Sequence, residues 1–241
     1  MADPLPSRSI ARRHLAIACV AVNALVFVLS RPALMAKGLH DLIGVVFLGA
    51  AMLGVRYDDD DTERYGVRLG GIFPGSAGDP RSLVRTVWEA APSALRELGV
   101  AGLVAALVLP VYSALWPLLN RPIAPRHFAL DADRWREIAT ELLAVAFTEE
   151  MFFRGFVQTR AGDALGVPAQ RPPWRDGARV VVITAALFAL THVVVDPTAA
   201  RAAVFFPGLV FGALRYARGG IGASVALHAT FNLWERYLEG R

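Results

Sequence analysis

The sequence contains little cysteine, little lysine and few charged residues, and each shortage narrows the classes of protein it can belong to. Cys19 is the only cysteine, which excludes an internal disulfide and a cysteine-based metal site. Lys37 is the only lysine among 25 basic residues, and this arginine bias is typical of a GC-rich bacterial genome. No GK[ST] phosphate-binding ending and no HExxH zinc motif occurs. No patch of basic and aromatic residues favours nucleic acid, so we expect no nucleic-acid partner.

The chain is instead rich in apolar residues. Hydrophobic residues make up 55% of it, charged residues 19%, and the mean hydropathy is +0.43, which is too apolar for an ordinary soluble domain. We expect an all-α, polytopic membrane helical bundle surrounded by membrane lipids. Judged by the need for about 20 mainly apolar residues per crossing helix, the chain has seven such segments, at about residues 15–29, 39–55, 99–119, 138–157, 180–195, 202–216 and 221–238.

These segments predict a single membrane domain with two parts. Residues 1–137 hold the N-terminal transmembrane helices and a polar loop at 56–97, and residues 138–238 hold the functional core. Arginines are more frequent on the side that the N-terminus shares, so the positive-inside rule predicts a cytoplasmic N-terminus in a bacterial inner membrane. The fourth segment then ends, and the fifth and seventh begin, on one face.

Three charged residues lie within two helical turns of the fourth apolar segment. Glu149, Glu150 and Arg154 occur in LLAVAFTEEMFFRGFV, and each charge at a membrane centre costs about 2.5–3.5 kcal/mol on insertion scales. Such residues are functional by default. Glu150 and Arg154 are four residues apart with the acid first, which predicts an ion pair. Glu149 projects about 100° away and is free for another role.

Other polar residues interrupt the later segments at comparable predicted depth. His192, His228 and Asn232 can meet Glu149 in one cavity, and His228 and Asn232 share a helix face. Peptide hydrolysis uses such a set. Glu149 with His192 would activate a water molecule, and His228 with Asn232 would donate hydrogen bonds to the oxyanion.

The ordered motifs resemble a known family. They are Glu149-Glu150-x-x-x-Arg154, Phe188-x-x-x-His192, Phe205-x-x-Gly208-x-x-x-Gly212 and His228-x-x-x-Asn232. This set, over about residues 138–234, resembles the CPBP family of type II CAAX prenyl endopeptidases and bacteriocin-processing or immunity proteins. The resemblance implies about eight membrane helices around an intramembrane catalytic cavity, so the seven segments fall one short.

The resemblance also implies a role for each motif residue. Glu149, His192, His228 and Asn232 are the expected catalytic residues, and Glu150 and Arg154 support them structurally. The phenylalanines and glycines of the motifs are expected to be structural, because small residues let membrane helices approach closely.

Two alternatives stay open on the residues alone. Glu149, His192 and His228 could ligate Zn²⁺ in a zinc-dependent protease, although a metal-free glutamate mechanism without a cofactor is preferred. Buried charges also suit a noncatalytic transporter or immunity protein. The expected partner is a membrane-associated protein or peptide substrate. The sequence specifies neither prenylation of that substrate nor the oligomeric state.

Overall fold

The computed structural model describes residues 7–54, 59–67, 80–120 and 131–240. Over these ranges the chain forms helices and no strand, which confirms the all-α prediction. The α-helices are α1 (Arg8–Leu29), α2 (Pro32–Met35), α3 (Leu42–Gly54), α4 (Asp59–Arg64), α5 (Pro80–Leu115), α6 (Ala132–Thr140), α7 (Phe147–Glu150), α8 (Gln158–Leu165), α9 (Trp174–Val195), α10 (Ala199–Ala203), α11 (Phe205–Arg218) and α12 (Gly222–Glu239). Two short 3₁₀ turns, η1 (Leu39–Asp41) and η3 (Trp116–Leu118), and two π-helical segments, η4 (Glu141–Ala146) and η5 (Met151–Val157), complete the set.

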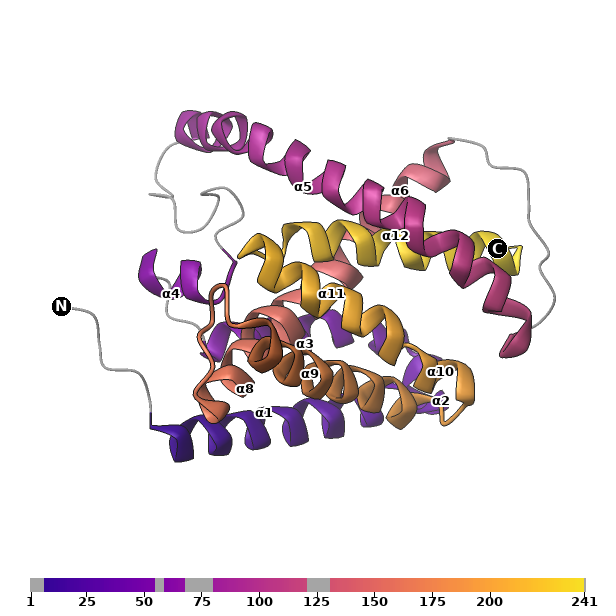
Figure 1. Cartoon of the computed structure of the whole chain (residues 1–241). Coiled ribbons are helices and arrows are strands. Elements are labelled where there is room, and N and C mark those ends of the chain that lie inside the picture. The colour runs from indigo at the N-terminus through magenta and orange to yellow at the C-terminus, as the bar shows by residue number, and fades with distance from the viewer. Residues whose placement is uncertain (1–6, 55–58, 68–79, 121–130, 241) are drawn as a thin grey trace.

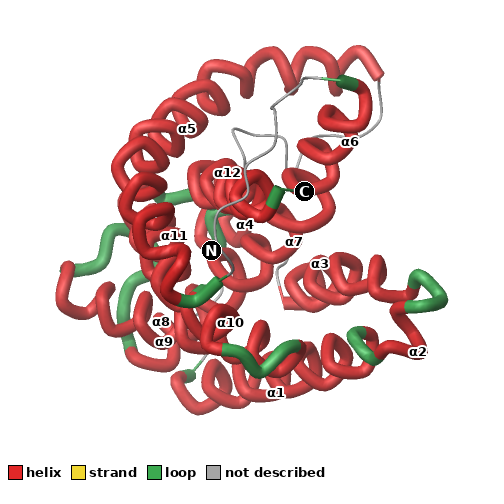
Figure 2. Tube along the Cα trace, turned by 90° about the vertical axis from the view of Figure 1, so that its right-hand side faces the viewer, coloured by secondary structure: helices red, strands yellow, loops and turns green. Residues whose placement is uncertain are grey.

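The helices surround a pair that carries the glutamates and one of the histidines. Figure 1 shows α5 crossing over α12, with α11, α9 and α8 beneath them and α1 on the opposite side of the bundle. In the perpendicular view, α7 and α12 lie near the centre, and α5, α11, α9, α1 and α3 are arranged around them (Figure 2). The candidate functional residues on α7 and α12 therefore lie inside the bundle.

Three of the described helices are long and apolar enough to cross a membrane. They span Arg8–Leu29, Val87–Leu118 and Trp174–Val195. Helix α3 is apolar but has 13 residues, about 20 Å of helix, which is shorter than a hydrocarbon core of about 30 Å. The protein is thus a helical membrane protein, while the predicted count of seven to eight crossings is not confirmed.

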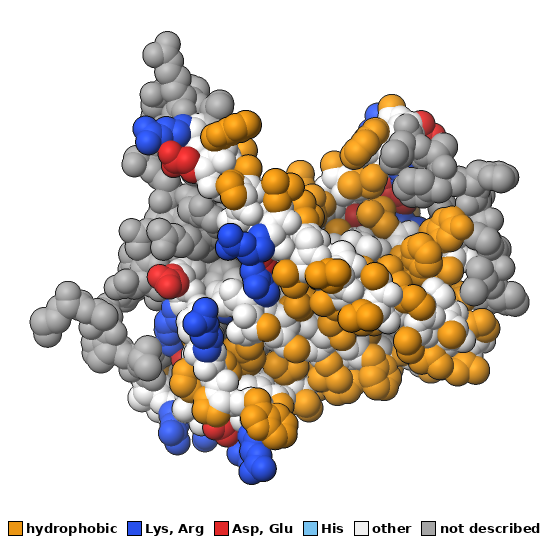
Figure 3. Space-filling model, turned by 45° about the horizontal axis from the view of Figure 1, so that its top comes forward, with side chains coloured by type: hydrophobic (Ala, Val, Ile, Leu, Met, Phe, Trp, Pro, Cys, Tyr) orange, Lys and Arg blue, Asp and Glu red, His pale blue; other side chains and the backbone are white. Residues whose placement is uncertain are grey.

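The surface of the bundle is largely apolar. Figure 3 shows hydrophobic side chains gathered over the right and lower part of the visible face, with arginine and acidic side chains mostly on the left and a smaller group at the upper right. Leu53 is 93% exposed and Leu107 75% exposed, although both belong to apolar helices. Trp88 and Trp174 are 80% and 77% exposed, and tryptophan is enriched where a protein meets the membrane–water interface. This surface suits lipid contact.

The helix ends meet in the order that the alternating crossings predict. Arg12 Nη2 near the start of α1 donates to the Ala164 carbonyl at the end of α8, at 3.4 Å. Gln170 Nε2, before α9, donates to the Gly219 carbonyl at the end of α11, at 3.2 Å, and α12 begins directly afterwards. The end of the fourth predicted segment and the starts of the fifth and seventh therefore share one face with the start of α1.

The prediction of a polar loop at 56–97 is wrong for part of this range, which is helical. Helix α4 occupies Asp59–Arg64, and α5 already begins at Pro80. Helix α5 then continues through Pro92 and Pro110, because one missing backbone donor does not end a helix of 36 residues. The rest of the predicted loop, 56–58 and 68–79, lies outside the described residues.

Candidate active site

The two glutamates lie in a helix with two irregular stretches. From Ala132 to Leu165 the chain is helical throughout, but η4 precedes and η5 follows the short α7 that contains Glu149 and Glu150. π-Helical segments have i→i+5 hydrogen bonds, are rare and occur frequently at functional sites. The regular helix predicted over 138–157 is therefore interrupted on both sides of the glutamates.

Glu150 forms the predicted ion pair with Arg154. Arg154 Nη1 donates to Glu150 Oε1 at 2.8 Å, and both side chains are completely buried. The guanidinium also donates from Nη2 to the Gly208 carbonyl at 3.1 Å and lies 4.4 Å from the centre of the Phe188 ring. Arg154 thus links the glutamate helix to α11 and α9 while it balances the buried charge of Glu150.

Glu150 has a second partner that the sequence did not predict. His228 Nδ1 lies 2.9 Å from Glu150 Oε1. A carboxylate only accepts hydrogen bonds, so Nδ1 must carry the proton and donate it, which leaves Nε2 of a neutral ring as an acceptor. Phe211 stacks on the same ring, with centroids 5.0 Å apart. Glu150 and Phe211 together set the tautomer and the orientation of His228.

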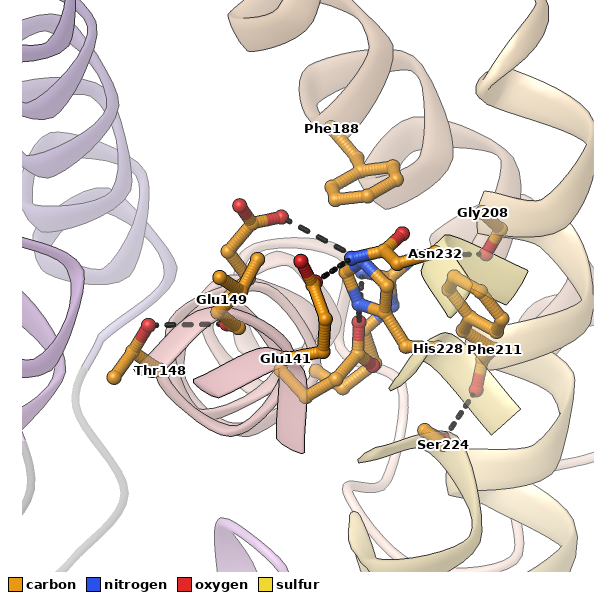
Figure 4. Close-up of polar contacts among 12 residues, drawn as sticks. Glu141, Thr148, Glu149, Phe188, Gly208, Phe211, Ser224, His228 and Asn232 are labelled. Atoms are coloured by element: carbon orange, nitrogen blue, oxygen red, sulfur yellow. Dashed lines mark hydrogen bonds and ion pairs between the residues drawn. The ribbon is translucent and has the colours of Figure 1, made fainter. Parts of the chain in front are cut away.

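Glu149 faces the other nitrogen of the same ring. Its Oε2 lies 3.9 Å from His228 Nε2, which is too long for a hydrogen bond, and this oxygen is buried without a hydrogen-bond partner in the protein. Figure 4 shows the Glu149 carboxylate turned toward His228. The two glutamates therefore approach opposite nitrogens of one imidazole. On the Glu149 side, Nε2 has no hydrogen bond to the carboxylate.

His192 lies beside this group but is not bonded to Glu149. Its Nδ1 lies 2.9 Å from the Phe188 carbonyl, so Nδ1 is the donor and Nε2 of the neutral ring is again an acceptor. The Phe188 ring is 4.5 Å from the His192 ring and 5.7 Å from the His228 ring. The structure brings the residues together without a direct hydrogen bond in the predicted Glu149–His192 pair.

Asn232 is held by Glu141, an acid that the sequence did not indicate as part of the site. Asn232 Nδ2 donates to Glu141 Oε2 at 3.0 Å (Figure 4), and Glu141 is only 2% exposed. The other oxygen of Glu141 pairs with Arg236. The spacing of Asn232 and Arg236, four residues apart on one helix, was the signal available in the sequence. Glu141 itself lies inside the fourth predicted segment but carried no motif.

The motif glycines allow α11 to pack directly on the site. A Cβ on Gly208 would lie 3.2 Å from Phe188 Cδ1, and one on Gly212 would lie 3.0 Å from Val181 Cγ1. Their carbonyls accept hydrogen bonds from Arg154 and from Gln158 Nε2. The structural role expected for Gly208, Gly212 and Phe188 agrees with these contacts.

The last motif residue, Phe205, lies elsewhere. Its ring packs on Phe206, with centroids 5.6 Å apart.

A preformed zinc site is not found in the described part of the chain. Within residues 7–54, 59–67, 80–120 and 131–240, no three His, Cys, Asp or Glu side chains converge as metal ligands would. The alternative set of Glu149, His192 and His228 is close together, but its atoms do not have ligand geometry here. The described side chains therefore do not fit Zn²⁺ in this arrangement.

Fold and site together define an integral membrane protein of helical bundle type with a buried acid, histidine and amide cluster. Residues 132–234 match the family described as type II CAAX prenyl endopeptidase Rce1-like. This match supports the family of CAAX-type intramembrane proteases that the motif resemblance predicts. The match begins with α6 and includes every predicted site residue. No curated protein and no solved structure matches the chain.

Proposed function

We propose that the protein is a metal-free intramembrane endopeptidase that cleaves a membrane-associated protein or peptide, with Glu149 as the general base. One observation supports this role above the others. Glu149 Oε2 is buried, has no hydrogen-bond partner in the protein and faces His228 Nε2 across 3.9 Å. A water molecule can contact both atoms across such a gap. An unpaired carboxylate beside an imidazole acceptor is suited to removing a proton from that water.

The proton and charge transfers follow from the positions of the donors and acceptors. Glu149 takes one proton from water, assisted by the nearby His192, and the oxygen attacks the peptide carbonyl carbon. The Nδ2 group of Asn232 donates to the oxyanion that forms. Glu149 then passes its proton to the nitrogen of the leaving amine as the carbon–nitrogen bond breaks, which restores the carboxylate.

His228 has its role defined by Glu150. Because Nδ1–H is committed to Glu150, Nε2 is the atom that faces Glu149 and the substrate. The proton that Glu149 takes from water can move to Nε2, from which the ring would donate to the oxyanion before the proton returns to Glu149 for the leaving amine. Arg154 in turn neutralises Glu150. Glu150 and Arg154 therefore act on the chemistry through His228.

We also propose a substrate class and a membrane orientation for the protein. The family description favours a prenylated C-a-a-X terminus as substrate, and a bacteriocin leader, a membrane anchor or a sorting signal would suit a bacterial membrane. We propose seven crossings, with the first, third and fifth formed by α1, α5 and α9. The starts of these helices would face the cytoplasm of the bacterium, which follows the arginine distribution.

The test compares Glu149→Gln with the wild type in purified full-length protein. The probe is a fluorescence-quenched peptide ending in a farnesylated C-a-a-X sequence, presented in nanodiscs. We expect cleavage by the wild type and its loss in Glu149→Gln, because an amide cannot act as a base. Glu89→Gln, which alters an exposed glutamate on α5, is the matched control and should cleave normally. Undiminished cleavage by Glu149→Gln would instead favour another base, and proton flux in vesicles without peptide products would favour a transporter.

A further inference from the structure

Glu141 belongs to a polar network that also contains Glu137 and Arg236, and it is the member that contacts Asn232 in the proposed site. It is buried, although it lies in the π segment η4 near the edge of the bundle. Arg236, partly exposed on α12, pairs with Glu141 and also with Glu137, with 3.4 Å between Arg236 Nη1 and Glu137 Oε1. The inner oxygen of Glu141 accepts from Asn232 at 3.0 Å. Glu141 is therefore the last charged group of the network before Asn232.

This contact determines which way the Asn232 amide points. An asparagine side chain can be turned over with little change in shape, which exchanges its donor and acceptor. Arg236 only donates, so Glu141 accepts from it as a carboxylate, which has only acceptors to offer Asn232. An accepting carboxylate requires Nδ2 of Asn232, and not its oxygen, on the Glu141 side. The second N–H of that nitrogen is left for another acceptor.

The π segment explains how Glu141 reaches α12. In a regular α-helix, the nine residues from Glu141 to Glu150 would place these side chains about 180° apart, on opposite faces. A π turn contains more residues than an α turn, so η4 reduces the rotation between them. Both acids consequently face α12, where Glu150 contacts His228 and Glu141 contacts Asn232.

We infer that Glu141 is a positioning residue, which holds the Asn232 amide in the orientation that donates to the oxyanion. This inference rests on the proposed peptidase function and adds a residue outside the family motifs quoted above. Glu141 acts only through Asn232 in this scheme. It should therefore affect the chemical step more than substrate binding.

The test is a double-mutant cycle with Glu141→Gln and Asn232→Ala in the full chain, measured on the farnesylated C-a-a-X peptide. In Glu141→Gln, the new amide oxygen turns to Arg236 and its NH₂ group faces Asn232, which forces the Asn232 amide to turn over. We expect kcat to fall between about 10-fold and 10³-fold, as when one oxyanion donor is lost, with KM changed less than about 3-fold.

The double-mutant cycle distinguishes a positioning role of Glu141 from a general loss of structure in the site. In the Asn232→Ala background, Glu141→Gln should lower kcat by less than about 2-fold, because the group it positions is already gone. Glu137→Gln is the matched control. It removes a charge from the same network without a contact to Asn232, and its kcat should stay within about 2-fold of the wild type. Equal losses from Glu141→Gln in both backgrounds would overturn the inference.

Thermal unfolding of the same four proteins gives a readout that needs no activity. Glu141→Gln should lower the Tm less in the Asn232→Ala background than in the wild type, because the two side chains are in contact. If the wild type cleaves and Glu149→Gln does not, the proposed function stands whatever Glu141→Gln does. If the wild type does not cleave, that proposal fails for this substrate, and an identical Tm loss in both backgrounds then also overturns the Glu141–Asn232 contact.

Discussion

Glu149 and Glu150 are sequence neighbours, yet replacing each by glutamine should damage the protein differently. Glu150 is completely buried, with Arg154 Nη1 at 2.8 Å and His228 Nδ1 at 2.9 Å. Glu150→Gln keeps the shape but leaves the Arg154 guanidinium buried without its counter-charge. Breaking such a pair by removing one partner costs about 3–5 kcal/mol.

Glu149 has no comparable partner. Its Oε2 accepts no hydrogen bond from the protein, and His228 Nε2 is 3.9 Å away. Glu149→Gln removes a buried charge that the fold does not balance directly, so the free energy of unfolding should stay unchanged or rise slightly. The same substitution should abolish cleavage. Stability and activity are thus expected to separate at adjacent residues.

Thermal unfolding of purified full-length protein in one detergent measures the difference, followed by the fluorescence of its 5 tryptophans. For a chain of this size each kcal/mol shifts the Tm by about 2–4 °C, so Glu150→Gln should lower it by about 6–20 °C. Glu149→Gln should stay within about 2 °C of the wild type. The double variant Glu150→Gln/Arg154→Met removes both charges and should recover more than half of the loss, because the uncompensated cation is gone.

Two results would refute this reasoning. Equal Tm values for Glu149→Gln and Glu150→Gln would mean that the buried pair does not stabilise the fold. The second result is a Tm loss in Glu150→Gln/Arg154→Met that equals the sum of the losses of the two single substitutions. Arg154 would then stabilise the protein through Gly208 and the aromatic rings rather than through Glu150.

Three further predictions concern packing, a surface ion pair and metal dependence. Gly208→Ala should cost about 1–3 kcal/mol through overpacking and lower the Tm, whereas Gly102→Ala, with no neighbour within 4 Å, should leave it unchanged or raise it. Arg218→Ala removes a partly buried two-pronged pair with Glu97 and should lower the Tm in a salt-sensitive way, whereas Arg85→Ala on the exposed face of α5 should not change it. Exhaustive chelation should leave cleavage intact with no stoichiometric zinc by elemental analysis; zinc whose removal abolishes turnover would contradict the metal-free mechanism.

Much of this protein follows from local sequence alone. An apolar run of helix length can be recognised without knowing what it packs against, because the transfer free energies of its residues add independently. The Glu150–Arg154 pair needed only their spacing of four residues on a helix. The motifs that Glu149, His192, His228 and Asn232 carry likewise identify the family, because their order and residue types do not depend on how the helices pack.

Tertiary structure decided which of these residues contact each other. Helical period assigned Glu150 to Arg154 alone, and comparable predicted depth paired Glu149 with His192. Packing of α12 instead placed His228 between the two glutamates. The sequence did not indicate Glu141 because the π segment η4 changes the helix rotation between Glu141 and Glu150, whereas a period of 3.6 residues puts these two side chains on opposite faces. Contacts between helices far apart in sequence depend on the phase and packing of both, and neither is contained in the spacing of a motif on one of them.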